Sequence, residues 1–425
     1  MLSEAVSNNY IRILEEELVL ATGCTEPISI AYCAAKMREV LGEEPIRVTA
    51  AVSGNILKNV KSVVVPNTGN HKGIKPAIAV GIVAGDASKS LQVIAHVDES
   101  HQPAIEEFLR EVPIEVSCAE TPCMLDISIT GTGEHHTATV RITNNHANII
   151  YIARDDTVLR DLPVVASSED NMADKSCLNV EDIIRFADTV NVEKIEPILQ
   201  QQVACNMAIA EEGIKNCWGA QIGRILLEDY GEDIKQKAKA YAAAGSDARM
   251  SGCEMPVVIL SGSGNQGITA SVPVVVYARH IGATREQLYR ALAVSDLITI
   301  HQKTGIGRLS AYCGAISAGV GAGAGICYLL GGGYRAVSHT VVNALSILSG
   351  TICDGAKPSC AAKISAAVDA GIMGYRMYLH HREFHCGEGI VAAGVDDTIA
   401  NVGVLASKGM LETDHTILEI MQSEP

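Results

Sequence analysis

Two cysteines flank a turn near the C-terminal end of the sequence. Cys353 and Cys360 lie seven residues apart in segment 351–363, and the turn between them contains Gly355 and Pro358. A third cysteine, Cys313, precedes this pair by 40 residues. Thiolates that project from facing helix ends are suitable ligands for a soft metal centre. These three residues are therefore candidate metal ligands.

The spacing of these cysteines leaves more than one interpretation open. Zinc sites usually show two cysteines separated by two to four residues, which this sequence lacks here. A single cysteine of a helical protein is more often a small buried side chain. Three thiolates without a nearby fourth would instead suit a [4Fe–4S] cluster, whose remaining iron is open and can act as a Lewis acid.

A different kind of cysteine lies near the beginning of the sequence. Cys24 is part of Gly23–Pro27, at the expected start of a helix. The N-terminus of a helix lowers the pKa of a thiol, which would make Cys24 available as a base or nucleophile. The alternative is a small core residue in a simple break between helices. The sequence alone does not decide between the two.

A glycine-rich segment could bind an anion. Residues 261–267 read Ser-Gly-Ser-Gly-Asn-Gln-Gly and lie between an apolar run and an expected helix. Successive backbone N–H groups at a helix start favour an anion, and without the lysine of a phosphate-binding loop a carboxylate is the better match. A plain connection remains the alternative. The candidate substrate-binding residues are Ser261, Ser263, Asn265 and Gln266, with Lys357 as either a further carboxylate ligand or a surface charge.

The histidines offer no recognisable metal motif. His301, the pair His380 and His381, and His385 occur near expected helix ends, but none has a metal-binding spacing such as His-Glu-x-x-His. Positions at solvated helix ends account for them. We therefore leave them out of the candidate site.

Composition limits the classes of partner. The net charge of the 425-residue chain is −16, with 49 acidic and 33 basic residues and no basic stripe. This argues against nucleic acids and anionic membranes as partners and leaves a small molecule. Thirteen cysteines without a recognisable signal peptide predict free thiols in the cytoplasm. The sequence leaves open whether the chain forms homo-oligomers.

The hydrophobic pattern predicts an α+β protein. Its period is helical over 3–20 and 30–41, changes to that of strands after residue 45, and is helical again from about residue 180. We expect a mostly helical catalytic domain (residues 1–44 and 176–425) with an inserted α+β domain (45–175). Residues 311–330 predict a buried central helix whose glycines allow close packing rather than a membrane span. The expected strands are 46–53, 61–66, 91–97, 114–119, 125–131 and 135–147.

Four segments together resemble the L-cysteine desulfidase family: Gly-Cys24-Thr-Glu-Pro, Ser-Gly-Ser-Gly-Asn-Gln-Gly267, Tyr-Cys313-Gly-Ala and Cys353-Asp-Gly-Ala-Lys-Pro-Ser-Cys360. That family is related to the alpha chain of bacterial iron–sulfur L-serine dehydratases. The resemblance implies that Cys313, Cys353 and Cys360 bind a [4Fe–4S] cluster and that Cys24 removes the α-proton of the substrate. The implied reaction is β-elimination of L-cysteine to pyruvate, ammonia and sulfide, without pyridoxal phosphate.

Two alternatives to this function stay open. The first is an iron–sulfur L-serine dehydratase, although those enzymes resemble this chain less closely: they carry a Cys-Asp-Pro segment and a longer gap to the next ligand cysteine. The second is a non-catalytic metal-binding or redox-sensing protein on the same scaffold. No lysine lies in a motif typical of a pyridoxal-phosphate Schiff base, in agreement with a cofactor of another kind.

Overall fold

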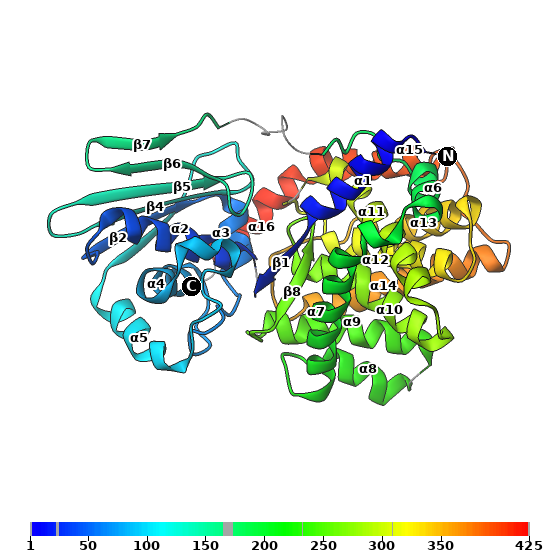
Figure 1. Ribbon diagram of the computed structural model, residues 1–425, viewed down its shortest axis with the longest axis horizontal. Coiled ribbons are helices and arrows are strands. Elements are labelled where there is room, and N and C mark those ends of the chain that lie inside the picture. The colour runs from blue at the N-terminus through cyan, green and yellow to red at the C-terminus, as the bar shows by residue number, and fades with distance from the viewer. Residues whose placement is uncertain (1, 23–24, 165–172, 232, 308, 424–425) are drawn as a thin grey trace.

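The chain folds into two lobes. Their arrangement is shown by a computed structural model, which describes residues 2–22, 25–164, 173–231, 233–307 and 309–423 (Figure 1). The larger one, the helical lobe, consists mainly of helices from the C-terminal half of the chain. The smaller one, the α/β lobe, holds a six-stranded sheet covered by helices. Each lobe has its own hydrophobic core. The predicted α+β class, dominated by helices, is confirmed.

Helix α11 of the helical lobe begins with a capping box. At the start of α11, the Thr284 hydroxyl accepts the N–H of Gln287 at 3.2 Å, and the Gln287 side chain accepts the N–H of Thr284 at 2.8 Å. The helices of this lobe are α1 (Glu4–Glu17), α6 (Val180–Thr189), α7 (Glu196–Lys215), α8 (Ile222–Tyr230), α9 (Ile234–Met250), α10 (Gly264–Ile281), α11 (Arg285–Ile306), α12 (Gly314–Leu329), α13 (Tyr334–Leu348), α14 (Cys360–Leu379), α15 (Val395–Val404) and α16 (Leu411–Ser423).

Helix α12 is buried at the centre of this lobe, between α10, α11, α13 and α14. Its glycines allow the neighbouring backbones to approach. A methyl group on Gly319 would lie 2.5 Å from the carbonyl carbon of Ala367, and one on Gly323 would lie 2.5 Å from the carbonyl oxygen of Gly371. The predicted close-packed central helix is confirmed. Within the described residues, no helix combines the length and the apolar character needed to cross a membrane.

The chain forms a strand directly after α1. Leu18–Thr22 (β1) pairs in antiparallel fashion with Pro256–Leu260 (β8). The prediction of one helix over residues 3–20 is therefore wrong for its last three residues. The short apolar run that begins at Leu18 suits either structure, and pairing with β8 satisfies the backbone groups of both strands. This two-stranded ribbon lies on the side of the helical lobe that faces the α/β lobe (Figure 1).

The sheet of the α/β lobe has the order β3-β2-β4-β5-β6-β7. Only the pair β2–β3 is parallel, and the remaining pairs are antiparallel. Its helices α2 and α4 contribute to one core with the buried side chains of the sheet. The elements of this lobe are α2 (Thr25–Leu41), β2 (Arg47–Val52), α3 (Gly54–Val60), α4 (Ile74–Ala84), α5 (Gln102–Glu111), β3 (Ile114–Cys118), β4 (Asp126–Thr132), β5 (Thr137–Thr143), β6 (Ile149–Arg154) and β7 (Thr157–Asp161).

Two of the expected strands do not form. The strands predicted at 46–53, 114–119, 125–131 and 135–147 correspond to β2 to β5. Segment 61–66 instead makes turns and a single bridge, and segment 91–97 begins in the last two residues of a short 3₁₀ helix (Ala87–Gln92) and continues in turns. Their Val and Ile side chains are buried, most of them in the core of the lobe, so burial and not sheet pairing explains their apolar character.

Helix α2 packs in a different lobe from the one we expected. The sequence placed both N-terminal helices in the helical domain, and α1 does contribute Tyr10 and Leu14 to that core. By contrast, α2 buries Ile28 and Met37 in the core of the α/β lobe. The Cys33 thiol of α2 donates to the carbonyl of Val140 in β5 at 3.3 Å. Residues 25–44 therefore pack with the α/β lobe, while the division into domains itself stays a prediction.

The C-terminal helix joins the two lobes. Helix α16 adds Ile417 to the core of the helical lobe and also contacts α3 of the α/β lobe. At this contact the ammonium of Lys58 and the carboxylate of Asp414 form a buried ion pair. A methyl group on Gly54 would lie 2.5 Å from the side chain of Leu418. This contact holds α3 in place, and α3 reaches the candidate site described next.

Candidate functional site

The three candidate metal ligands line one small cavity. Its volume is about 90 Å³, and Cys313, Cys353 and Cys360 all contribute to its wall. Glu26 and Asn59 enter it from the α/β lobe. The other polar side chains that line it come from the helical lobe: Arg249, Ser263, Asn265, Gln266, Lys303, Ser310, Tyr312 and Lys363.

Backbone pairing brings Cys313 and Cys353 together. The segments that carry them form a short antiparallel bridge. The N–H of Cys353 donates to the carbonyl of Ala311 at 2.6 Å, and the N–H of Cys313 donates to that of Thr351 at 3.0 Å. Cys313 then precedes the first residue of α12. This pairing explains how a cysteine 40 positions upstream reaches the pair around the turn.

The turn that carries the other two thiols has a tight geometry. Cys360 is the first residue of α14, and its thiol donates to the carbonyl of Gly355 at 3.7 Å. Gly355 adopts a φ of 100°, which favours glycine. A methyl group there would also lie 2.5 Å from the carbonyl oxygen of Lys58 in α3. The glycine therefore permits both the turn and its contact with the α/β lobe.

Burial and a neighbouring thiol raise the pKa of two of the cavity thiols. Burial raises the pKa of Cys313 to about 12, and the nearby Cys353 adds to the increase. Burial also raises the pKa of Cys360. Lys363, which lines the same cavity, acts in the opposite direction on both thiols. A bound cation would replace these protons, because metals bind the thiolate form.

The donors suit a soft metal or an iron–sulfur cluster in number and chemistry. Three thiols that line one cavity are the ligands such centres use. As placed, however, no group of three or more His, Cys, Asp or Glu side chains within the described part of the chain has the spacing to hold a metal ion. The twelve cysteines described here are all free thiols. Metal binding by Cys313, Cys353 and Cys360 therefore stays a prediction.

The glycine-rich segment begins a helix earlier than its sequence suggests. We expected α10 to start near residue 267, but it starts at Gly264, so Asn265 and Gln266 lie in its first turn. Both line the cavity, as does Ser263 at the N-cap. The buried guanidinium of Arg249 donates to the Asn265 side chain at 3.1 Å. A methyl group on Gly264 would overlap that guanidinium, which explains the glycine.

Two of the predicted substrate-binding residues lie elsewhere. Ser261 adopts a φ of 48° in the turn that joins β8 to α10, and it is not among the residues that line the cavity. Lys357 forms an ion pair with Asp354, which also binds Lys363 at 2.6 Å. Of these two lysines, it is Lys363 that lines the cavity. The structure thus gathers Ser263, Asn265 and Gln266 at the cavity but not Ser261 or Lys357.

The predicted base, Cys24, lies outside the described residues. Its neighbours along the chain are described. The hydroxyl of Thr25 donates to the carbonyl of Gly262 at 2.8 Å, next to the start of α10. Glu26 lines the cavity. The role of Cys24 stays a prediction.

Five charged or amide side chains that line the cavity are not found by sequence reasoning. Glu26 lies in the first turn of α2 and Lys303 in the last turn of α11. Both are buried. Asn59, Arg249 and Lys363 lie in segments without a motif, far apart in the sequence. Only the tertiary structure brings these residues to the cavity.

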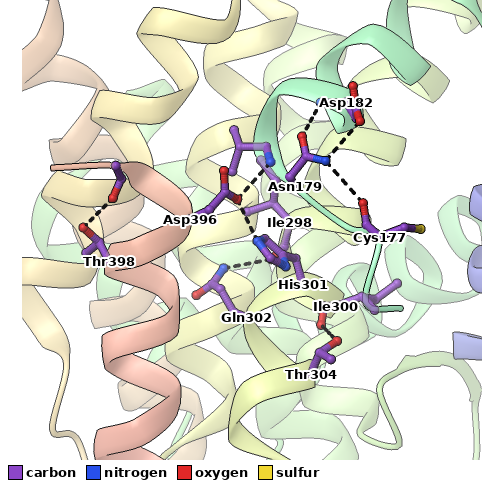
Figure 2. A network of polar contacts seen from close by, with 12 residues as sticks. Cys177, Asn179, Asp182, Ile298, Ile300, His301, Gln302, Thr304, Asp396 and Thr398 are labelled. Carbon is purple, nitrogen blue, oxygen red and sulfur yellow. Dashed lines mark hydrogen bonds and ion pairs between the residues drawn. The ribbon is translucent and has the colours of Figure 1, made fainter. Parts of the chain in front are cut away.

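His301 has a structural role. The Nε2 atom of His301 lies 2.8 Å from Oδ1 of Asp396, and the same oxygen accepts the N–H of Val180 at 3.1 Å (Figure 2). Asn179 caps α6 by accepting the N–H of Asp182 at 2.9 Å. This network joins α6, α11 and α15. The three thiols that line the cavity are not part of this network, in agreement with leaving His301 out of the site.

Comparisons with known proteins find a matching family and several similar proteins. A model of the family described as serine dehydratase alpha chain matches residues 88–419. A UPF0597 protein of Desulfitobacterium hafniense is 53% identical, with 98% of this chain and 96% of that protein covered. UPF0597 proteins of Treponema denticola (99% and 99% covered) and Finegoldia magna (97% and 99% covered) are 44% and 46% identical.

Proposed function

We propose that this chain, which belongs to the serine dehydratase alpha-chain family, is a lyase that eliminates the β-substituent of a small α-amino acid. The substrate that we propose is L-cysteine, which would yield pyruvate, ammonia and sulfide. The proposed cofactor is a [4Fe–4S] cluster, and the proposed location is the cytoplasm. The observation that carries the proposal is the gathering of three thiols with charged and amide side chains around one cavity.

Cys313, Cys353 and Cys360 would hold the cluster. Three protein thiolates leave one iron open, and this iron would supply the Lewis acid that makes the β-substituent a better leaving group. The chain's own contribution is to present the three thiols from two paired segments and one helix start. Asp354 holds Lys363 beside them, so a positive charge lies close to the thiolates.

The substrate would be held by the part of the cavity wall that the start of α10 forms. The first turn of α10 has backbone N–H groups without intrahelical partners, and such groups bind carboxylates. Arg249 adds a buried positive charge next to Asn265. Together they would bind the α-carboxylate of the substrate.

Proton removal is the second task of the site. We propose Cys24 as the general base that takes the α-proton, while the bond from Cβ to sulfur breaks and the electron pair leaves with the sulfur. The resulting aminoacrylate hydrolyses to pyruvate and ammonia. Support comes from the next two residues, because Thr25 binds the turn before α10 and Glu26 lines the cavity.

L-Serine is the second candidate substrate, favoured by the description of the matching family. Elimination of its hydroxyl would use the same groups and release water. Side-by-side assays with L-cysteine and L-serine, with pyruvate measured for both and sulfide for the first, separate the two substrates. Bound iron without pyruvate from either amino acid would favour a metal-binding or redox-sensing protein.

The cluster is tested by anaerobic reconstitution followed by iron and sulfide analysis. We expect about four irons per chain in the parent protein. The variants Cys353→Ala and Cys360→Ala should lose most of this iron, whereas the exposed Cys386→Ala is a matched control that should retain it. Absence of iron from the reconstituted parent, or full retention in Cys353→Ala, would overturn the assignment.

A further inference from the structure

We propose that Lys58 and Asp414 are positioning residues for the cavity that the three thiols line. Their ion pair would hold the wall contributed by the α/β lobe against the wall contributed by the helical lobe, and so keep the cavity closed. Neither residue is among those that line the cavity. The proposal goes beyond the proposed function, because it concerns the shape of the cavity and holds for any ligand bound there.

The cavity is built from both lobes. Asn59 and Glu26 come from the α/β lobe, and the three thiols come from the helical lobe. Nδ2 of Asn59 donates to Oε1 of Glu26 at 3.1 Å, so these two side chains form one unit of the wall. Ligand sites often lie between two domains in this way, and their accessibility then depends on how closely the domains approach.

Helix α3 is the element through which the ion pair reaches the cavity. Lys58 directly precedes Asn59 in this helix. A methyl group on Gly355 would lie 2.5 Å from the carbonyl oxygen of Lys58, and Gly355 belongs to the turn between Cys353 and Cys360. The backbone of Lys58 therefore contacts the turn that carries two of the thiols, while the next residue lines the cavity. Its side chain binds α16.

The ion pair is almost completely enclosed by protein. The side chains of Lys58 and Asp414 are 1% and 8% exposed. A buried ion pair adds little stability over two apolar side chains of similar size, but either charge becomes costly when its partner is lost. Separation of α3 from α16 would expose both charges to that cost. The pair is therefore suited to fixing one arrangement of the two helices.

The interface between the lobes is only partly filled. Among the described elements, the lobes contact each other mainly where α3 meets α16 and where α2 and the 3₁₀ helix Ala87–Gln92 meet β1. A groove of about 1200 Å³ is lined by Met124 and Asn145 of the α/β lobe and by Leu309 and Asp414 of the helical lobe. Leu309 also lines the cavity of the thiols. Lobes joined in this way are expected to move relative to each other unless a specific contact holds them.

The test measures how readily Cys313 reacts in the full-length, metal-free protein. Cys313 lines the cavity and is 7% exposed. Two maleimides that differ only in the size of the N-substituent are compared, with modification followed by peptide mass spectrometry. A change in the pKa of the thiol alters both rates alike, whereas a wider opening accelerates the bulky reagent more. The fully buried Cys327, in the helix that follows Cys313, reports unfolding of the helical lobe.

The double variant Lys58→Met with Asp414→Leu removes the ion pair without leaving a buried charge. The bulky maleimide should modify Cys313 roughly 10-fold faster than in the parent, with less than about 3-fold change for the small one, because α3 opens locally. The reaction of Cys327 should not change. Asp414→Glu keeps the carboxylate, and the groove that Asp414 lines has room for one more methylene, so this variant should retain the parent rates. The exposed Lys408→Met is the matched control and should retain them too.

Two results would overturn the proposal. One is an unchanged reaction of Cys313 with the bulky maleimide in the folded double variant. The other is equal acceleration at Cys313 and Cys327, since the ion pair would then only stabilise the fold. If thermal unfolding shows that the double variant is not folded, Asp414→Asn takes its place, and the bulky reagent should modify its Cys313 at least about 3-fold faster than in the parent.

The outcome is separable from that of the proposed function. The alkylation rates are measured without substrate or turnover, so they test the ion pair whether or not the protein forms pyruvate. Pyruvate formation with unchanged alkylation in the double variant would support the lyase and reject the positioning role of Lys58 and Asp414.

Discussion

Cys313 and Cys353 are held next to each other by the backbone of their segments, through hydrogen bonds of 2.6 and 3.0 Å that involve the N–H groups of these two cysteines themselves. Neither bond uses a sulfur atom. Main-chain pairing therefore brings these two cysteines together.

Removing the Cys353 thiol should therefore leave the metal-free fold intact. For Cys353→Ala we expect a loss of about 1 kcal/mol or less in the free energy of unfolding, because only one half-buried sulfur is lost. Urea unfolding of metal-free parent and variant, followed by circular dichroism, measures this. A loss above about 3 kcal/mol would show that the thiol supports the fold, and iron loss in this variant could then not be assigned to ligation.

Much of the helical framework can be predicted from the sequence because it depends on local signals. Apolar spacing and capping residues such as Thr284 and Gln287 act within one or two turns of a helix. The glycines of α12 likewise predict close packing, and a methyl group on Gly319 would indeed overlap α14. The lobe to which α2 belongs could not be predicted in this way, because Ile28 and Met37 would suit either core.

The candidate site is predicted only in part for the same reason. The three cysteines and the start of α10 carry recognisable patterns, and the structure brings them to one cavity. Arg249, Asn59 and Lys363 have no such pattern, because their significance comes from distant segments that pack against them. Lys357 and Lys363 are an example of what the sequence does not predict. Both bind Asp354, but of the two only Lys363 lines the cavity.

Breaking the buried pair between the lobes should destabilise the protein strongly. Lys58→Met removes the ammonium and leaves the carboxylate of Asp414 buried without its counter-charge. We expect a loss of roughly 3–5 kcal/mol in the free energy of unfolding, measured by urea denaturation. The double variant Lys58→Met with Asp414→Leu should recover part of this loss, because no charge is then left buried. The exposed Lys408→Met should change stability little. Equal stability of Lys58→Met and the parent would mean that the lobes do not depend on this pair.

Adding one methyl group to α12 should disturb the central packing. In Gly323→Ala the new methyl would lie 2.5 Å from the carbonyl oxygen of Gly371, so α12 and α14 would have to separate. Overpacking costs typically about 1–3 kcal/mol, which exceeds the gain of about 1 kcal/mol in helix propensity. We therefore expect a lower midpoint of thermal unfolding.

Gly333→Ala is the matched control for this change. A methyl group at Gly333 would have no atom within 4 Å, and the φ of this residue is −85°. Its stability should stay within about 0.5 kcal/mol of the parent. If Gly323→Ala were as stable as this control, the close approach of α12 and α14 would be wrong.

The buried carboxyl of Asp296 should make stability depend on pH. Burial raises the pKa of Asp296 to about 7, although a hydrogen bond from Gln202 at 2.9 Å opposes the increase. In the unfolded chain this carboxyl ionises near pH ~3.9. Between these two values the folded protein keeps a proton that the unfolded chain has released, so stability is highest below pH ~4 and falls as the pH rises towards 7.

Replacing Asp296 with asparagine should remove this contribution. Oδ2 of Asp296 and Oε1 of Gln202 are both buried without a partner within the described chain. When Asp296 is protonated, its Oδ2–H could therefore donate to Oε1 of Gln202. The amide that the substitution introduces could make the same pair of bonds at every pH. Between about pH 5 and 7 the free energy of unfolding of the parent should therefore fall by about 2 kcal/mol more than that of Asp296→Asn. Urea unfolding of both proteins at several pH values across this range provides the comparison. Parallel pH profiles would contradict this prediction. They would mean that Asp296 is already ionised in the folded state and is stabilised by a partner other than Gln202.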